Sequence, residues 1–184
     1  MQAFGYKSKN DKADAGGLAR MGAEQQLEVW QPMGDFFYQL RQLTRHHQNL
    51  QESITAFKNQ LHALEHSAWS AKEVVAQQKQ LIKLLEKQVQ QTRDAILKLI
   101  STNEDVQQRM KNICMIQGVA LMSSATIVAE TNGFALFRNI RQLVSYAGYD
   151  VVENQSGKHV GRTKISKKGN SKIRRILYLP SINV

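Results

Sequence analysis

The feature of this chain that most constrains its fold is a long run, residues 34–112, that contains no proline and, after Gly34, no glycine. The run is rich in glutamine, leucine and lysine, a composition that favours helices. Core positions recur there at alternating steps of four and three, from Phe36 to Leu64 and again from Ile82 to Ile113. Sustained four-three spacing is the heptad pattern of a coiled coil. We therefore expect residues 34–112 to form a coiled coil.

The heptad pattern is interrupted once, at residues 65–69, and residues 70–73 directly after the break have the spacing of a capping box. This predicts two helices of roughly 30–40 residues joined at the break, rather than one rod. The helices can pair with each other as an antiparallel hairpin or with other subunits, and the spacing does not choose between these. His47 and Asn103 occupy core positions, where a lone polar side chain can set the register. For His47 this interpretation is preferred to a metal ligand.

The segment after the heptads has the pattern of shorter helices. Residues 121–130 and 136–147 each show helical apolar spacing, with a glycine-containing turn at 131–133 between them. This layout resembles a helix-hairpin-helix, in which a glycine lets backbone amides approach phosphate, and it fits a plain pair of packed helices equally well. Residues 169–171 supply a turn and a cap before a last helix. The expected fold is mainly α, a long antiparallel coiled-coil hairpin followed by a small, helix-hairpin-helix-like DNA-binding domain.

The positive charge of the chain is concentrated near its C-terminus. Residues 1–155 hold 17 Lys and Arg and all 15 Asp and Glu, whereas residues 156–184 hold eight Lys and Arg and no acid. A local cationic excess of this kind favours nucleic acid, because each neutralised phosphate releases a counterion. An anionic membrane and a tail that serves only solubility are the weaker alternatives. The cations are Lys158, Arg162, Lys164, Lys167, Lys168, Lys172, Arg174 and Arg175.

Neither a leader peptide nor an apolar stretch of about 18 residues is present, so we expect neither export nor a membrane span. A soluble, cytoplasmic protein without a membrane partner is the prediction.

Two features carry reactive groups. Asp11 and Asp14 lie three residues apart, so on a helix they share a face and could offer two oxygen ligands to Mg²⁺. The same spacing is common on solvated helix starts, where acids favour the helix dipole. Ser156 and Gly157 precede the basic residues, and spacing alone favours a phosphate-binding turn over a nucleophile, since no catalytic triad or nucleophile elbow is evident.

These pieces together resemble one family. The sequence is similar to insertion-sequence transposases of the DEDD type, relatives of the Piv-type DNA invertases. Lys9-Asn-Asp11-Lys-Ala-Asp14-Ala resembles the family's K-x-D-x-x-D-A motif, and Ile116-Gln-Gly118-Val-Ala120 resembles its I-P-G-I-G turn, with departures at Gln117 and Ala120. The most specific elements are S-G, I-x-K-x-G-N and L-R-R-x-L-Y, which correspond in order to residues 156–157, 165–170 and 173–178.

The resemblance implies a RuvC-like nuclease domain, a coiled-coil insertion and a C-terminal transposase domain, here at residues 1–33, 34–112 and 113–184. It implies that Ser156 attacks a DNA phosphodiester and that Asp11 and Asp14 bind Mg²⁺. It also implies phosphate contacts at Gly118 and Gly157 beside the basic residues, and a guide RNA for some relatives. Homo-oligomers through the coiled coil are a further expectation.

The family's first aspartate and its glutamate have no counterpart in this sequence, and the family continues beyond Tyr178. The resemblance therefore predicts a truncated transposase that binds DNA without catalysing transposition alone. The alternative function is a non-catalytic DNA- or RNA-binding protein with a coiled coil.

Overall fold

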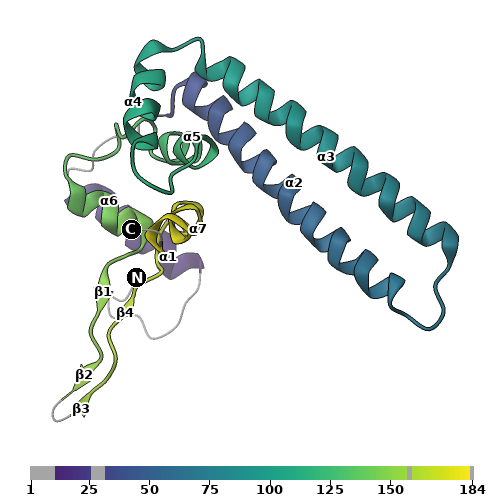
Figure 1. Cartoon of the computed structure of the whole chain (residues 1–184). Coiled ribbons are helices and arrows are strands. Elements are labelled where there is room, and N and C mark those ends of the chain that lie inside the picture. Colours follow the sequence, from purple (N-terminus) through teal and green to yellow (C-terminus); the bar gives the residue numbers. More distant parts are fainter. Residues whose placement is uncertain (1–10, 26–31, 157–158, 183–184) are drawn as a thin grey trace. The chain divides into compact units, whose positions relative to one another are not determined.

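The computed structural model describes residues 11–25, 32–156 and 159–182 (Figure 1). The chain divides into two compact units, Met1–Pro32 and Met33–Val184. In the first unit, helix α1 spans Asp11–Glu24. The second unit holds the other helices and strands of the described residues, so the helical hairpin and the C-terminal segment belong to one unit.

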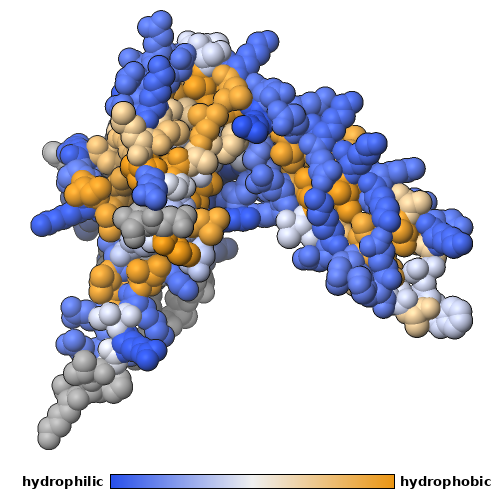
Figure 2. All heavy atoms as spheres, viewed as in Figure 1, coloured by the Kyte–Doolittle hydropathy of each residue, from blue (hydrophilic) through white to orange (hydrophobic). Residues whose placement is uncertain are grey.

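The second unit is built on a hairpin of two long helices, α2 (Asp35–Glu65) and α3 (Lys72–Ile100). They lie side by side and run in opposite directions, which confirms the predicted antiparallel hairpin (Figure 1). Apolar residues follow the seam between the helices, and polar residues cover their outer faces (Figure 2). Leu40 and Ile96 are fully buried at the end of the hairpin that carries the rest of the unit.

Two details of the helix boundaries differ from the prediction. The second helix does not continue to residue 112, because a break after Ile100 precedes helix α4 (Glu104–Cys114). Asn103 accepts a hydrogen bond from the Val106 amide at 3.1 Å, so it caps α4 and does not set a coiled-coil register. The capping box at residues 70–73 is also wrong: Ala71 is the N-cap of α3 and makes no side-chain capping bond.

Helix α5 (Leu121–Glu130) has the predicted bounds and forms the centre of the unit. It packs against α2, α4 and the later helix α7 (Ser171–Tyr178), and every residue from Ser124 to Glu130 is buried. The core around it consists of Leu40, Ile96, Ile100, Val106, Met110, Ala125, Val128 and Ala129.

The predicted turn after α5 is present, with Asn132, Gly133 and Phe134 at φ values of 51°, 62° and 68°. A Cβ on Gly133 would lie 2.6 Å from the Phe37 ring, so no larger residue fits without a shift. Helix α6 (Ile140–Ala147) begins four residues later than predicted, because Asn139 caps it through the Gln142 amide.

A β-arm, which the sequence did not predict, follows α6. Strand β1 (Val151–Val152) pairs with β4 (Lys164–Ile165), and β2 (Gln155–Ser156) pairs with β3 (His159–Val160), both antiparallel. The arm extends away from the helices of the second unit (Figure 1), and the chain returns through α7 to a short 3₁₀ turn, η2, at Pro180–Ile182. Among the described residues, no helix is both long and apolar enough to cross a membrane.

Candidate nucleic-acid interface

The β-arm is held at its base by two backbone segments in close contact. The amides of Ser166, Lys167 and Asn170 donate to the carbonyls of Asp150, Gly148 and Tyr146 at 2.8, 3.0 and 2.7 Å. This hydrogen bonding extends the antiparallel pairing of β1 and β4 to the helices, so it fixes where the arm leaves the unit.

Gly169 allows this contact. A Cβ at Gly169 would lie 2.4 Å from the Tyr146 carbonyl oxygen and 2.6 Å from the Gly148 amide nitrogen. Both neighbours are backbone atoms that cannot move independently of the arm. The glycine of the I-x-K-x-G-N element is therefore required for packing at the base of the arm.

Ser156 lies at the outer part of the arm, where its backbone pairs with that of His159. Gly157 and Lys158, two of the predicted phosphate contacts, lie outside the described residues. Arg162, Lys164, Lys167 and Lys168 follow β3 and are all exposed. We call these four residues the arm cations.

The cations of α7 behave differently from the arm cations. Arg174 donates to the carbonyl oxygen of Ala147 at 2.7 Å, which anchors α7 to the end of α6. Arg175 forms an ion pair with Glu52 of α2. Lys172 is half-buried beside the start of α7. Arg174 and Arg175 thus already have intramolecular partners, and DNA contact by these three side chains stays a prediction.

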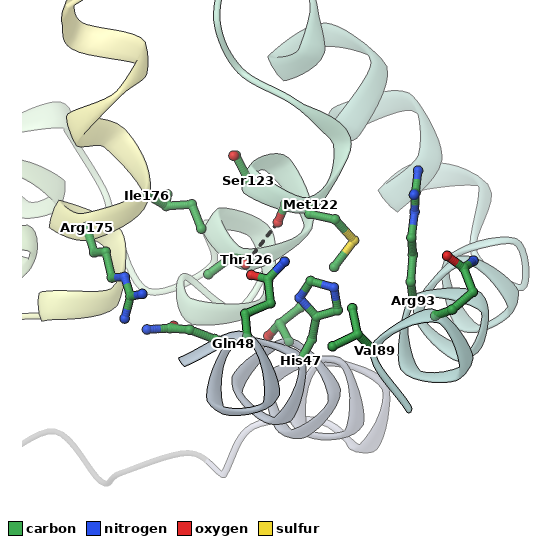
Figure 3. Close-up of a pocket in the computed structure, with 12 residues that line it drawn as sticks. His47, Gln48, Val89, Arg93, Met122, Ser123, Thr126, Arg175 and Ile176 are labelled. Atoms are coloured by element: carbon green, nitrogen blue, oxygen red, sulfur yellow. Dashed lines mark hydrogen bonds between the residues drawn. The ribbon is translucent and has the colours of Figure 1, made fainter. Parts of the chain in front are cut away.

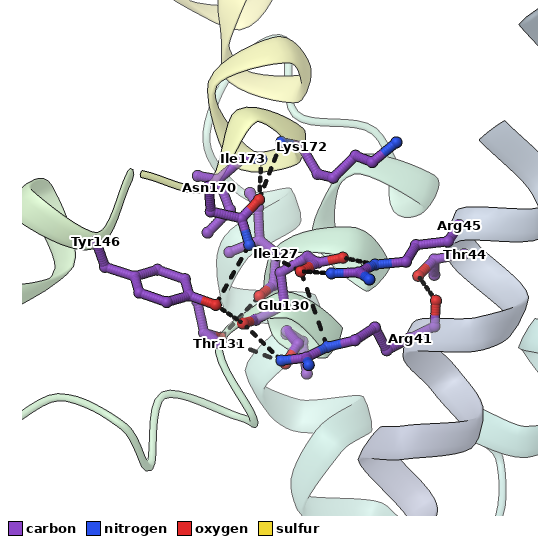
Figure 4. Close-up of polar contacts among 11 residues, drawn as sticks. Arg41, Thr44, Arg45, Ile127, Glu130, Thr131, Tyr146, Asn170, Lys172 and Ile173 are labelled. Carbon is purple, nitrogen blue, oxygen red and sulfur yellow. Dashed lines mark hydrogen bonds and ion pairs between the residues drawn. The ribbon is translucent and has the colours of Figure 1, made fainter. Parts of the chain in front are cut away.

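A buried glutamate connects α7 to the hairpin. Glu130, at the end of α5, is fully buried and accepts two hydrogen bonds from the Arg45 guanidinium at 2.7 and 2.9 Å (Figure 4). Arg41 lies 3.8 Å from the same carboxylate, and the Asn170 side-chain amide donates to it at 2.8 Å. One carboxylate therefore joins α2, α5 and the start of α7.

Asn170 has two roles at this point. Its side-chain nitrogen donates to Glu130, and its side-chain oxygen accepts from the amides of Lys172 and Ile173 at 2.9 and 3.3 Å (Figure 4). The Tyr146 hydroxyl also donates to the backbone carbonyl of Glu130 at 3.1 Å. Asn170 was predicted only as a cap. Glu130 was missed, although a lone acid at the end of an otherwise uncharged helix pattern was a visible signal.

The electrostatics of this cluster favour the charged carboxylate. Burial by itself would raise the pKa of Glu130, but hydrogen bonds from Arg45 and Asn170 and the charges of Arg45 and Arg41 outweigh it, so the pKa is lowered. The pKa of Arg45 is raised, chiefly by its hydrogen bond to Glu130. Both groups are ionised at neutral pH.

Gly118 lies in the turn between α4 and α5, with a φ of 81° that only glycine adopts readily. Gln117, Gly118 and Ala120 are exposed, whereas Val119 between them is buried. Ala120 is the N-cap of α5 and makes no side-chain capping bond, so no cap side chain occupies the first amides of α5. This geometry permits the predicted approach of a phosphate, which stays a prediction.

Asp11 and Asp14 lie in the first turn of α1, so the helix on which their shared face depends is present. Their separation of three residues places both carboxylates on one face of the helix. Among the described residues, no group of three or more His, Cys, Asp or Glu side chains is close enough together to hold a metal ion. The described part of the first unit thus offers two carboxylates on one helix face.

Two transposase families match the chain, one in its N-terminal part and one in its C-terminal part. The family described as Transposase (DEDD_Tnp_IS110) matches residues 2–66, and the Transposase IS116/IS110/IS902 family matches residues 110–184. The second range contains the turn at Gly118, the β-arm and the α7 cap. Together these matches show that the chain belongs to the insertion-sequence transposases.

Individual relatives agree with this class. The chain is similar to the pilin gene-inverting proteins of Moraxella bovis and Moraxella lacunata, with 23% identity over 184 residues in both cases. The alignments cover 100% of this chain and 55% of each relative, so the chain spans about half the length of the curated relatives it matches.

Proposed function

We propose that this chain acts in DNA transposition or site-specific recombination, with the β-arm as its DNA-contacting part and Ser156 as the nucleophile. The observation that carries the proposal is the position of Ser156 on an arm whose four exposed cations follow it without an intervening acid. The carboxylates of the arm, Asp150 and Glu153, precede Ser156, and Asp150 accepts a hydrogen bond from Ser145 at 2.8 Å. Phosphate is thus favoured on the side of the arm that follows the serine.

The proposed reaction is a transesterification. The Ser156 hydroxyl oxygen forms a bond to phosphorus while the bond from phosphorus to a bridging sugar oxygen breaks. The hydroxyl proton leaves to a base, and the departing sugar oxygen gains a proton. A second DNA hydroxyl then attacks the same phosphorus, which restores the serine and joins the new strands. The arm cations stabilise the negative charge on the phosphate during both steps.

The DEDD type typically uses a divalent metal, and Asp11 and Asp14 suit part of such a site. Carboxylate oxygens on one helix face match the preference of Mg²⁺ for hard oxygen ligands, with the remaining positions left for other ligands or water. A bound Mg²⁺ would polarise the phosphate or stabilise the leaving oxygen. In this proposal the two aspartates would hold and orient the metal ion, and Ser156 performs the covalent step.

Covalent capture of DNA tests the serine. The full chain is incubated with Mg²⁺ and nicked element-end DNA, and protein–DNA adducts are separated on a denaturing gel. Ser156→Ala is expected to abolish the adduct while DNA affinity stays within about twofold of the original, because a nucleophile's loss removes chemistry and not phosphate contacts.

Ser181→Ala is the matched control, since Ser181 is exposed and its hydroxyl donates within the described residues to the Tyr178 carbonyl alone. It should leave the adduct unchanged. An adduct that persists in Ser156→Ala, or a failure of the unsubstituted chain to form one, would reject serine attack by this chain.

We propose two further partners, a guide RNA and a second copy of this chain. Some transposases of this type take a guide RNA, and the arm cations would bind RNA phosphates as readily as DNA phosphates. A second copy could contact the outer faces of the α2–α3 hairpin. A soluble, cytoplasmic location fits these nucleic-acid partners.

A further inference from the structure

A pocket of about 310 Å³ with a mixed polar and apolar lining lies in the second unit, where α2 and α3 face α5 and α7. His47 of α2 forms part of its wall, with Met122 and Ser123 of α5 nearby (Figure 3). Arg93 of α3 and Arg175 of α7 lie on opposite sides (Figure 3). The volume is at the lower end of the range for small-molecule sites.

The lining of the pocket favours an anion. It combines two guanidinium groups, one imidazole, the Ser123 hydroxyl and several glutamine amides, and no aspartate or glutamate is among the described residues that line it. Arg93 is exposed and makes no ion pair within the described part of the chain. Arginine forks match the oxygens of phosphate closely, which makes such a pair of guanidinium groups selective as well as attractive.

His47 provides an independent observation. It is only 7% exposed, yet its ring makes no hydrogen bond to any described residue. The ring nitrogens of His47 keep some contact with solvent, so a ligand in the pocket can reach them. Burial, followed by the charges of Arg93 and His46, lowers the pKa of His47, so the free imidazole is neutral near pH 7. A neutral imidazole can still donate one hydrogen bond to a phosphate oxygen.

From this geometry we propose that the pocket binds a phosphate group. The contacts come from His47 of α2, Arg93 of α3, Arg175 of α7 and Ser123 in the first turn of α5. The phosphate can belong to nucleic acid or to a free phosphate compound, because both present the same oxygens. The proposal is separate from the reaction at Ser156 and does not depend on it.

The ion pair between Arg175 and Glu52 controls access to this site. Glu52 is exposed, pairs with Arg175, and also accepts from the Gln48 side-chain amide at 2.8 Å. A phosphate in the pocket would compete with the Glu52 carboxylate for both groups. Removal of this carboxylate should therefore strengthen phosphate binding.

The test follows the imidazole resonance of His47 by NMR, identified by its loss in His47→Gln, during titration of the full chain with inorganic phosphate at constant ionic strength. A saturable shift is expected. Arg93→Gln should weaken the affinity about tenfold, the effect of one lost charge-assisted contact. Glu52→Gln should strengthen it about threefold. Lys87→Gln, which removes an exposed charge of α3 outside the pocket lining, should change it less than twofold.

A His47 resonance that does not move at phosphate concentrations on the order of tens of millimolar would overturn the proposal. Equal losses in Arg93→Gln and Lys87→Gln would also overturn it, because they would indicate general charge attraction. A second titration with a short single-stranded oligonucleotide identifies the source: displacement of inorganic phosphate assigns the pocket to nucleic acid, and no displacement assigns it to a free phosphate compound. Ser156→Ala should leave these titrations unchanged, so the two proposals fail separately.

Discussion

Glu130 is the residue on which the arrangement of the second unit most depends. It ion-pairs with Arg45 and accepts from Asn170 while fully buried. The carboxylate therefore connects α5 to α2 and to the start of α7, which are far apart in the sequence.

Glu130→Gln should lower the free energy of unfolding at pH 7 by about 2 kcal/mol. The loss is below the roughly 3–5 kcal/mol of fully buried pairs, because the side chain of Arg45 is 47% exposed and can be hydrated. Since the folded pKa of Glu130 is lowered, its contribution is complete above the ordinary glutamate pKa and is lost as the pH falls through the folded value.

Urea unfolding across pH 3–7 measures this effect. The difference between the two proteins should shrink as the pH falls below about 4. Glu86→Gln, which breaks an exposed ion pair with Lys58, should cost less than about 1 kcal/mol. A pH-independent difference for Glu130→Gln would contradict the assigned role of the carboxylate.

Asn170 can be compared with a second capping asparagine in the same unit. Asn139 caps α6 through one bond, to the Gln142 amide, and is exposed. Asn139→Ala should cost about 1 kcal/mol of unfolding free energy. Asn170→Ala should cost about 2–3 kcal/mol, because it removes the cap of α7 and leaves Glu130 with one donor fewer. Equal costs in urea unfolding would show that the contact with Glu130 contributes nothing.

At the scale of elements, the sequence predicted which segments are helical better than it predicted where each helix begins and ends. The α2–α3 hairpin, α5 and the cap of α7 followed from periodicity and from local capping chemistry. The break at Asn103 was missed, because Asn103 itself fits the four-three spacing, so the heptad pattern continues through the residue that caps α4. The β-arm was missed because its strands are two residues long, too short for an alternating pattern to be visible.

The arm cations should set the salt dependence of DNA binding. Replacing Lys164, Lys167 and Lys168 by Gln should lower the slope of log affinity against log salt by about 2–3, close to 0.9 for each lost phosphate contact. Fluorescence anisotropy with duplex DNA at several salt concentrations measures the slope.

The control for this experiment has the same change in net charge. Lys83, Lys87 and Lys98 are exposed on α3, away from the arm, and their replacement by Gln should change the slope by less than about 1. If the two triple variants lose the same slope, DNA contacts are spread over the unit and the arm has no special part in binding.

At the scale of the whole molecule, the candidate site is only partly readable from the sequence. The charge excess after Glu153 and the order of elements around Ser156 pointed to phosphate chemistry. Spacing could not reveal that Arg174 and Arg175 have intramolecular partners, since Ala147 and Glu52 are distant in the chain. The pocket at His47 could not be predicted either, because its walls come from four helices that are separate in the sequence.

The central claim is that Ser156 on the arm attacks DNA. The most direct measurement is mass spectrometry of the adduct formed with nicked element-end DNA, after digestion of both protein and DNA. The account predicts a nucleotide phosphate on the peptide that contains Ser156, attached to that serine. A nucleotide on any other residue would contradict it.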